Sequence, residues 1–527
     1  MSRRVHLLVE GMYLRADSIA RDAHLQLGLM RNLGLEVEVF ADRFDAAHYP
    51  GVRTRALAEL EAAHEQAPAL LVYHWVDGWR EAEALLPRLP GPLVIRWHNN
   101  TPPWFFAPYS PLPTHKTVRG FTALLRTAER LPAARFWVNS QFSQEQLISL
   151  GIAPARIDVL APASPLLEST AAPAPAPSAA PGAPIRLLFV GRIVPHKGQL
   201  HVIAAAAALQ QMTGRPVWVV LPGRGDADMP GYVAELTGLA RRLGVRLELP
   251  GEIAHEQLAA MYRAADVFVG LSEHEGFGLP ILEAVAHDVP VVAYQSSAVT
   301  ETVADHPLAV TTLDPVEVAR RLLAALDPAA RAELIAWQRA AILPRFSTQA
   351  VERKLYALLG AAGVDLPAPP PTVAESPAPA VPQAVAAALA HALAHPDPVG
   401  TLPRDLPRDQ NPHFVTRWDL RAYSTLLRPE ATGELRERAF KFRFGSHRPR
   451  LGALFGLVKM LVLRLQDGLL RTMEISHGEL ADQLRSIDDK LDTLAGALGD
   501  RRLPPAPRPG EAPRADETPL SEPPATR

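Results

Sequence analysis

Short apolar runs of strand length alternate with segments of helix length through the first part of the chain, and this alternation limits the fold more than any other feature. The strand-length runs are Val5–Val9, Val37–Phe40, Ala69–Tyr73, Leu93–Trp97 and Arg135–Val138. Segments between them, such as Ser18–Asn32, are long enough for helices. Strands that are apolar throughout are typical of parallel sheets, because helical crossovers cover both faces of such sheets. We therefore expect a Rossmann-like α/β domain over residues 1–165.

The same rhythm restarts after a segment rich in proline and alanine, residues 166–184, which we interpret as an extended linker because it cannot pack a core. The later strand-like runs are Ile185–Val190, Val217–Leu221, Leu247–Leu249, Val267–Val269 and Val289–Ala293. They predict a second Rossmann-like domain over residues 185–362. Two such domains in tandem place a cleft at the carboxyl ends of their strands, where open α/β folds bind ligands.

Charge and composition exclude several classes of protein. The 54 basic and 56 acidic residues nearly cancel, so no overall field attracts nucleic acid, and we expect no nucleic-acid partner. The chain contains 0 cysteines, which excludes disulfides, thiolate metal sites and thiol nucleophiles. No uncharged apolar stretch reaches about 18 residues, so a transmembrane helix is not expected. We therefore expect a soluble or peripheral protein, and the lack of cysteine fits a reducing cytoplasm.

The C-terminal part differs in kind from the two α/β blocks. Residues 363–433 form a region rich in proline and alanine that we interpret as a linker, and residues 501–527 are polar, proline-rich and predicted to be disordered. Residues 434–500 combine many basic residues with apolar residues at helical spacing, which predicts a basic amphipathic helix for anionic lipid. Heptad spacing over residues 470–498 predicts a short coiled coil and a homo-oligomer. A helix packed on the two α/β blocks and an intramolecular helix pair are the alternatives.

A cationic loop follows the first strand of the second block. Residues Val190–Gly198 read VGRIVPHKG, in which Gly191 ends the strand and lets a ligand approach the backbone closely. Arg192 offers a planar fork for two phosphate oxygens, and Lys197 offers a compact charge. Together they could neutralise a diphosphate without a metal. The alternative is a surface loop that carries two solvated cations.

Two glutamates with seven residues between them flank a glycine-rich turn in SEHEGFGLPILE, residues Ser272–Glu283. The start of the helix after this turn would direct N–H groups and a dipole at an anion or at hydroxyl oxygens. Glu283, one turn into that helix, could accept hydrogen bonds from a ribose diol, and Glu275 could accept one from a hexose hydroxyl. Alternatively, Glu283 is a carboxylate that favours the helix dipole, and Glu275 is a loop charge.

The order of these motifs over residues 185–303 resembles the retaining glycosyltransferases of the GT-B superfamily, specifically the group 1, family 4-like enzymes, which include enzymes of bacterial surface-polysaccharide synthesis. The resemblance implies a two-domain GT-B fold, with Arg192 and Lys197 on the donor diphosphate, Glu275 on the donor sugar and Glu283 on the ribose. The other donor-binding positions that it implies are Gly11, Gly191, Gly223, Ile253, Gly276, Phe277, Gly278 and Leu279.

The first block matches this family more loosely. His98, after the strand Leu93–Trp97, stands where the family often presents a histidine to the donor sugar, so we include it among the catalytic candidates. A structural histidine at a strand end is the alternative. Asn139 and Ser140 fit the family's usual strand end and could equally cap a helix. His74, in YHWVDGW, is a weaker candidate.

The activity that the resemblance implies is transfer of a hexose-type sugar from a nucleotide-diphosphate donor to a lipid-linked glycan, with retention and without cofactor or metal. It would serve cell-surface polysaccharide or lipopolysaccharide synthesis, in the cytoplasm or at the cytoplasmic face of the inner membrane. Asp226 and Asp228, the single Asp-x-Asp of the donor half, lie in a polar loop and are not expected to bind a metal. A sugar-nucleotide epimerase of the same architecture and a sugar-nucleotide-binding scaffold remain alternatives.

Overall fold

The computed structural model describes residues 3–13, 17–162, 182–370 and 378–398, together with Ser164, Leu167 and single residues between 402 and 423. The predicted basic helix and coiled coil within residues 434–500, the tail at residues 501–527 and most of the 166–184 linker lie outside the described residues.

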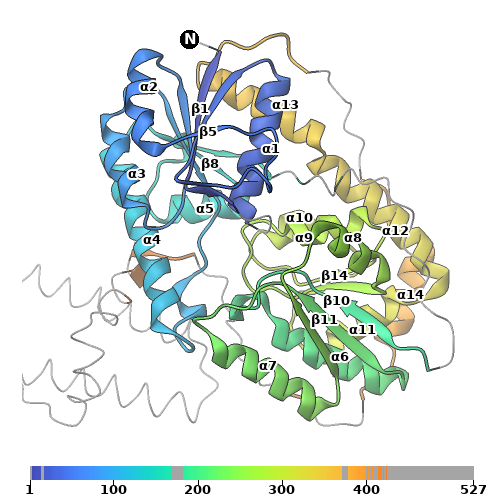
Figure 1. The fold of residues 1–527 in the computed structure, drawn as a ribbon. Coiled ribbons are helices and arrows are strands. Elements are labelled where there is room, and N and C mark those ends of the chain that lie inside the picture. The colour runs from blue at the N-terminus through green and yellow to red at the C-terminus, as the bar shows by residue number, and fades with distance from the viewer. Residues whose placement is uncertain are drawn as a thin grey trace, which may run out of the picture. The chain divides into compact units, whose positions relative to one another are not determined.

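The first domain is built on a parallel 7-stranded sheet with the order β5-β3-β1-β6-β7-β8-β9 (Figure 1). Its strands are β1 (Arg4–Val9), β3 (Glu36–Phe40), β5 (Thr54–Arg55), β6 (Leu70–His74), β7 (Leu93–Trp97), β8 (Arg135–Val138) and β9 (Ile157–Val159). The short strands β2 (Gly11–Met12) and β4 (Arg43–Phe44) form a separate parallel pair. Its helices are α1 (Ser18–Asn32), α2 (Leu60–Gln66), α3 (Arg80–Leu85), α4 (Pro111–Arg130) and α5 (Gln141–Ser149).

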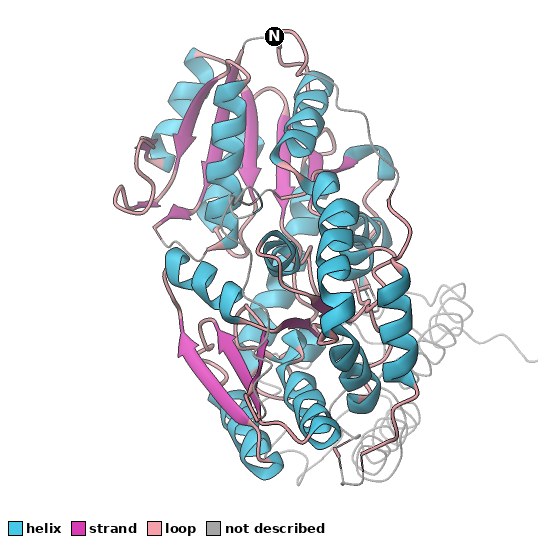
Figure 2. Cartoon of the chain, turned by 90° about the vertical axis from the view of Figure 1, so that its right-hand side faces the viewer, coloured by secondary structure: helices cyan, strands magenta, loops and turns pink. Residues whose placement is uncertain are grey.

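The second domain is built on a parallel 5-stranded sheet with the order β12-β11-β10-β13-β14. Its strands are β10 (Ile185–Leu188), β11 (Val217–Pro222), β12 (Arg246–Gly251), β13 (Val267–Gly270) and β14 (Val291–Ala293). Its helices are α6 (Gln199–Thr213), α7 (Pro230–Leu243), α8 (His255–Ala264), α9 (Leu279–Ala286), α10 (Val299–Val303), α11 (Pro315–Ala325) and α12 (Pro328–Ile342). Figure 2 shows the strands of each sheet side by side with helices packed against them. The two parallel sheets confirm the predicted architecture.

Burial on both faces explains why the strands are apolar throughout. In β1, Val5 and Leu7 pack with α1, whereas Leu8, on the opposite face, packs with residues of α3 and α4. All three side chains are inaccessible to solvent. Successive side chains of a strand point to opposite faces, so a strand covered by helices on both sides needs apolar residues at every position.

The chain returns to the first domain after α12. Helix α13 (Thr348–Ala361) packs beside α1 through Val351, Leu355 and Leu359, within the same apolar cluster as β1 (Figure 1). Residues 348–361 were expected in the second domain, within residues 185–362, because helical periodicity does not tell which sheet a helix covers. The chain therefore passes between the two domains a second time, from α12 to α13.

The region interpreted as a linker, residues 363–433, contains packed structure. Helix α14 (Gln383–Leu393) buries Val385, Ala388 and Ala392 in the core of the second domain, next to α11 and α12. Further along, the backbone of Val415 exchanges hydrogen bonds with the side chain of Gln146 on α5. The alanine-rich composition led to the linker prediction and not to α14, because alanine is common in helices as well as in low-complexity segments. Within the described part of the chain, no helix has the length and apolar character needed to cross a membrane.

Candidate functional site

The glycine-rich turn of the second domain contacts the start of α5 in the first domain. The hydroxyl of Ser140 donates to the carbonyl of Gly276 at 2.9 Å and caps α5 by accepting from the N–H of Ser143. The carboxylate of Glu301, on α10, accepts from the backbone N–H groups of Gln141 at 2.9 Å and Phe142 at 3.1 Å. A carboxylate of one domain thus caps a helix of the other, where the helix dipole favours negative charge.

Two of the predicted glycines make close approaches, Gly276 at the contact between the domains and Gly223 within the second domain. A Cβ on Gly276 would lie 2.8 Å from the carbonyl oxygen of His98 and 3.0 Å from Cβ of Asn99, so a larger residue would push the domains apart. A Cβ on Gly223 would lie 1.8 Å from the carbonyl oxygen of Gly191, so the loops after β10 and β11 touch through their backbones. Both predicted glycines therefore hold loops in contact.

Lys197 and Glu275 form an ion pair in which Nζ lies 2.6 Å from Oε1. The hydroxyl of Ser272 donates to the same carboxylate oxygen at 2.8 Å, and the N–H of Glu275 donates to the hydroxyl of Ser297 at 2.8 Å. The side chains of the pair are only 17% and 14% exposed, so neither of these two charges is freely solvated. The structure thus brings the two predicted motifs together.

Arg192 lies in the same cationic loop, and its side chain is exposed. Among the described residues, its guanidinium has neither a hydrogen bond nor an ion pair. The start of the cationic loop also lies close to the second motif, because Val190, Glu275 and Gly278 line one small cavity of about 10 Å³. The exposed guanidinium is therefore available to an anion beside the Lys197–Glu275 pair.

Glu283 lies on α9 and is only 2% exposed. Its Oε1 accepts from Nη2 of Arg21 at 3.2 Å and from the hydroxyl of Ser164 at 3.0 Å, and its Oε2 accepts from the hydroxyl of Tyr262 at 3.1 Å. Burial, together with the charge of Glu283, raises the pKa of Tyr262 well above its usual value, so this hydroxyl stays a donor. Glu283 therefore connects the second domain to the first through its buried carboxylate.

The sequence alone gives little sign that Arg21 and Tyr262 are partners of Glu283. Arg21 stands in the first turn of α1, and its only sequence signal is a cation close to the predicted glycine loop at Gly11. Tyr262 lies on α8 amid apolar residues and reads as core. Neither position stands at a spacing that relates it to Glu283.

The remaining positions predicted to bind the sugar donor differ in which of their atoms are accessible to a ligand. The side chain of Phe277 is buried against Phe346, so only its backbone is available to a ligand. Leu279 begins α9, whose N-cap is Gly278 with a φ of 101°. Gly11 is buried in β2, and Ile253 is half-buried in the loop between β12 and α8.

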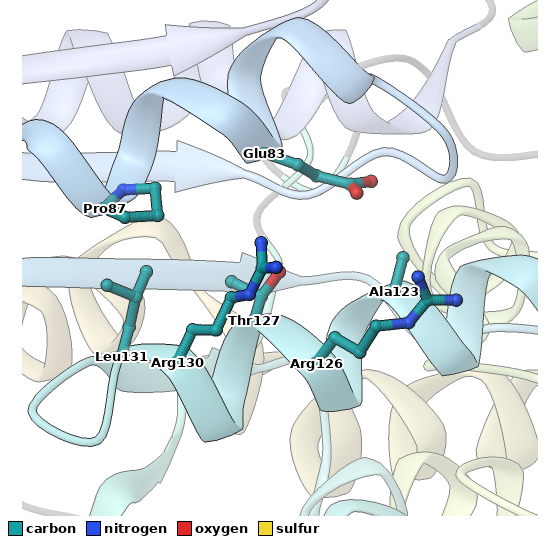
Figure 3. Close-up of a pocket in the computed structure, with 7 residues that line it drawn as sticks. All are labelled: Glu83, Pro87, Ala123, Arg126, Thr127, Arg130 and Leu131. Carbon is teal, nitrogen blue, oxygen red and sulfur yellow. The ribbon is translucent and has the colours of Figure 1, made fainter.

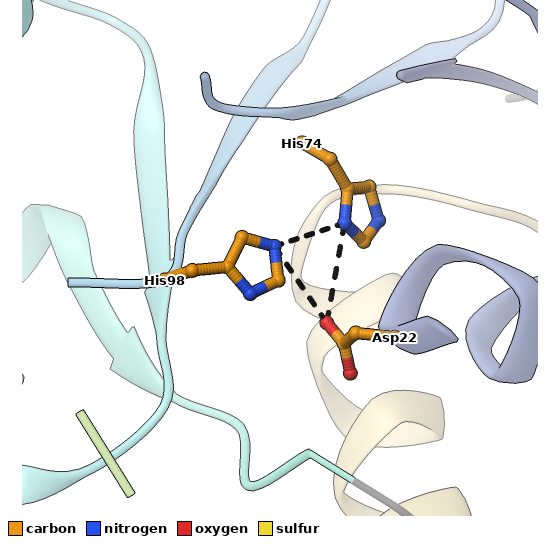
Figure 4. A group of neighbouring side chains, drawn as sticks. All are labelled: Asp22, His74 and His98. Carbon is orange, nitrogen blue, oxygen red and sulfur yellow. Dashed lines mark hydrogen bonds and ion pairs between the residues drawn. The ribbon is translucent and has the colours of Figure 1, made fainter. Parts of the chain in front are cut away.

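His98 lies at the end of β7 in a buried polar cluster with His74 and Asp22 (Figure 4). Its Nε2 is 3.1 Å from Nδ1 of His74, and each of these nitrogens lies 3.9 Å from Oδ2 of Asp22. The same Oδ2 accepts from Nε of Arg96 and from Nε2 of Gln26, both at 2.8 Å. Burial alone would raise the pKa of Asp22, but Arg96 and the two histidines outweigh it, and the pKa is lowered.

The ligand atoms of Asp22, His74 and His98 lie within 4.8 Å of one another, a spacing that a metal ion could span. The carboxylate oxygen that would bind the ion, however, already accepts two hydrogen bonds. One donor is the fully buried guanidinium of Arg96, whose positive charge opposes a second cation. These residues fit a hydrogen-bonded network better than a metal site.

A separate polar cavity of about 70 Å³ lies between α3 and α4 in the first domain. Figure 3 shows Glu83 of α3 across from Arg126 and Arg130 of α4. None of the predicted site residues lines it, so it forms no part of the site built by the two motifs.

Residues 173–335 match the family model described as glycosyl transferases group 1. The D-inositol 3-phosphate glycosyltransferase of Kineococcus radiotolerans is 31% identical over 308 residues, which cover 49% of this chain and 68% of that protein. The protein of the same name from Mycolicibacterium gilvum is 37% identical over 168 residues, or 31% of this chain and 37% of that protein. The chain thus matches little more than a third of the second relative.

Two solved structures resemble the fold. The Anabaena protein HepE, in complex with UDP-glucose, superposes with a TM-score of 0.53 at 20% identity and covers 68% of this chain and 99% of that chain. Sucrose-phosphate synthase from Thermosynechococcus elongatus superposes with a TM-score of 0.51 at 20% identity, with coverage of 68% and 99%. At this identity the likeness shows the two-domain architecture alone.

Proposed function

The chain belongs to the glycosyl transferases of group 1, and on this premise we propose that it moves a hexose-type sugar from a nucleotide-diphosphate donor to a lipid-linked glycan, with retention of configuration. The step would serve cell-surface polysaccharide or lipopolysaccharide synthesis. One observation carries this proposal: the Lys197–Glu275 ion pair at 2.6 Å, which joins the cationic loop to the glycine-rich turn. The UDP-glucose complex of HepE supports a nucleotide-sugar donor.

The charges at this junction suit a donor diphosphate. A diphosphate carries more negative charge than a carboxylate and would compete with Glu275 for Lys197. Arg192, exposed in the same loop, would take a second pair of phosphate oxygens. Glu275, released from Lys197, would then accept a hydrogen bond from a hydroxyl of the donor sugar. The ion pair thus holds both side chains in place before the donor arrives.

In the proposed reaction, the bond between the anomeric carbon and the diphosphate oxygen breaks, and its electrons stay on that oxygen. Lys197 and Arg192 stabilise the charge that develops there. The acceptor hydroxyl forms the new bond to the anomeric carbon on the same face, and its proton passes to a phosphate oxygen. The products are a glycoside with retained configuration and a nucleoside diphosphate. Neither a metal nor a covalent enzyme intermediate takes part.

The acceptor and its location extend the proposal to the rest of the chain. We assign acceptor binding to the first domain, and attachment to the cytoplasmic face of the inner membrane to residues 434–500, with oligomerisation through residues 470–498. The names of the two relatives favour a second acceptor class, a phosphorylated cyclitol, because one of them matches over 68% of its length.

A panel of UDP-, GDP- and dTDP-sugars, incubated with the purified full-length chain, tests the donor half of the proposal. Slow hydrolysis of one donor to its nucleoside diphosphate and free sugar is the expected result. Isomerised donor would indicate an epimerase, and donor that is bound but unchanged would indicate a scaffold; both would contradict the proposal. With the active donor, transfer to lipid-linked glycan rather than to inositol phosphate decides the acceptor. The anomeric coupling in the proton NMR spectrum of the product decides retention.

A further inference from the structure

The contacts of His98 determine which of its two ring nitrogens is accessible to a ligand. Its Nε2 faces Nδ1 of His74 at 3.1 Å, inside the buried cluster. Its other nitrogen, Nδ1, points away from the cluster in Figure 4 and has no partner among the described residues. The side chain is 11% exposed, so Nδ1 is the ring nitrogen that a ligand can reach.

The two facing nitrogens share a single proton, which belongs to either His74 or His98. If His98 carried it on Nε2, neutral His74 would carry its own proton on Nε2. That atom is buried and has no hydrogen-bond partner among the described residues, so it would be an unsatisfied N–H group. If His74 carries the shared proton on Nδ1, its Nε2 is only an unused lone pair, and orphaned N–H groups are the rarer defect. His98 then accepts at Nε2 and is protonated at Nδ1.

Both rings are held neutral. Burial lowers the pKa of His74 to about 4, and the charge of Arg96 adds to burial while that of Asp22 opposes it. Burial also lowers the pKa of His98 well below its usual value, and Asp22 again offsets only part of the effect. Arg96, which donates a hydrogen bond to the carboxylate of Asp22, adds to the effect of burial on both rings.

We propose that His74, supported by Asp22 and Arg96, is a positioning residue that fixes His98 as a neutral imidazole with its proton on Nδ1. This inference rests on the proposed function. His98 would then donate a hydrogen bond to an oxygen of the donor sugar, and it would not act as a base. A neutral donor suits this place, because positive charge develops on the sugar as the leaving group departs, and an imidazolium would oppose that charge.

Nitrogen-15 NMR of the full-length chain labelled at histidine tests the protonation state directly. Long-range nitrogen–proton correlations distinguish the two neutral tautomers and the imidazolium, and His98→Gln assigns the signals by their loss. At pH 7 we expect His98 to carry its proton on Nδ1. A proton on Nε2, or on both nitrogens, would overturn the proposal, even if the chain transferred no sugar.

Substitution of His74 tests the positioning role. Asn places an amide N–H near the position of Nδ1, so His74→Asn should keep the His98 tautomer and most of the turnover. His74→Phe fills similar space without a donor, so the His98 proton should move to Nε2, and kcat should fall roughly 10- to 100-fold. Affinity for the free nucleoside diphosphate should stay unchanged in both variants, which separates this role from donor binding.

Asn and Phe variants that behave alike would show that the ring only fills space and would refute the role of its N–H group. If His74→Phe fails to fold, the wild-type spectrum and His74→Asn still decide the matter, because each makes a prediction of its own.

Discussion

Replacing Glu283 by Gln separates ribose binding from structural support. The carboxylate accepts hydrogen bonds from Arg21, Ser164 and Tyr262 within a site where it is 2% exposed. Gln keeps the shape and one acceptor oxygen, so the loss of stability should be about 1 kcal/mol, or roughly 2–4 °C in Tm. A charge-assisted hydrogen bond to a ribose hydroxyl contributes about 1.5–3 kcal/mol, so the Kd of the nucleoside diphosphate should rise roughly 10- to 150-fold.

Calorimetry with UDP or GDP, whichever binds, and with its 2′-deoxy and 3′-deoxy analogues measures this effect. If Glu283 binds the ribose diol, Glu283→Gln should weaken binding of the full nucleotide strongly, and binding of at least one analogue only slightly. Glu333→Gln, an exposed position on α12, is the matched control and should change neither Kd nor Tm. An equal loss of affinity for the full nucleotide and both analogues would mean that Glu283 acts only through the fold.

The other predictions concern the diphosphate, the sugar, metal ions and acid. Lys197→Ala should lower turnover by roughly 100- to 1000-fold, which is the loss seen when one oxyanion donor is removed. The control Lys354→Ala, on the exposed face of α13, should leave turnover unchanged. Near-normal turnover of Lys197→Ala would exclude its role at the leaving group. Glu275→Ala should spare calorimetric affinity for the free nucleoside diphosphate and impair use of the sugar donor, and parallel losses would contradict this division. EDTA should leave transfer intact, and loss of transfer with rescue by Mn²⁺ would establish a metal requirement. Burial lowers the pKa of His74 and His306 from 6.5 to about 4, so both rings are neutral in the folded protein above pH 6.5. As the pH falls from 6.5 to about 4, each histidine should lower the free energy of unfolding by about 1.4 kcal/mol per pH unit, because the unfolded chain binds the proton more readily. A urea midpoint that is equal at pH 7 and pH 5 would refute this.

Local patterns alone predicted the two α/β domains. The strand ranges read from the sequence agree with the observed strands to within a few residues, as for Leu93–Trp97, which is identical to β7. The agreement has a physical cause: a strand covered by helices on both faces must be apolar throughout, and this requirement acts on neighbouring residues. The order of the motifs likewise predicted the glycosyltransferase family, because it resembles the order of motifs in that family.

Composition led to a wrong prediction where the same residue pattern is compatible with both a linker and a packed helix. Alanine-rich residues 383–393 resemble a linker, yet they form α14, because the neighbouring helices α11 and α12 offer an apolar surface that alanine side chains fill. Helix α13 follows the second block in sequence and packs on the first sheet for the same reason: apolar periodicity shows that a helix has a buried face, but not what covers that face.

Only the tertiary structure decided which charges meet. The pairing of Lys197 with Glu275 joins two loops of the second domain, whereas that of Glu283 with Arg21 joins the second domain to the first. The contact of His74 with His98 joins two neighbouring strands of the first sheet. Residue spacing describes a single strand or helix, but these contacts depend on how parallel strands align their carboxyl ends and on how one domain packs on the other. The sequence by itself determined which groups are present and which segments fold, and packing determined which of those groups are partners.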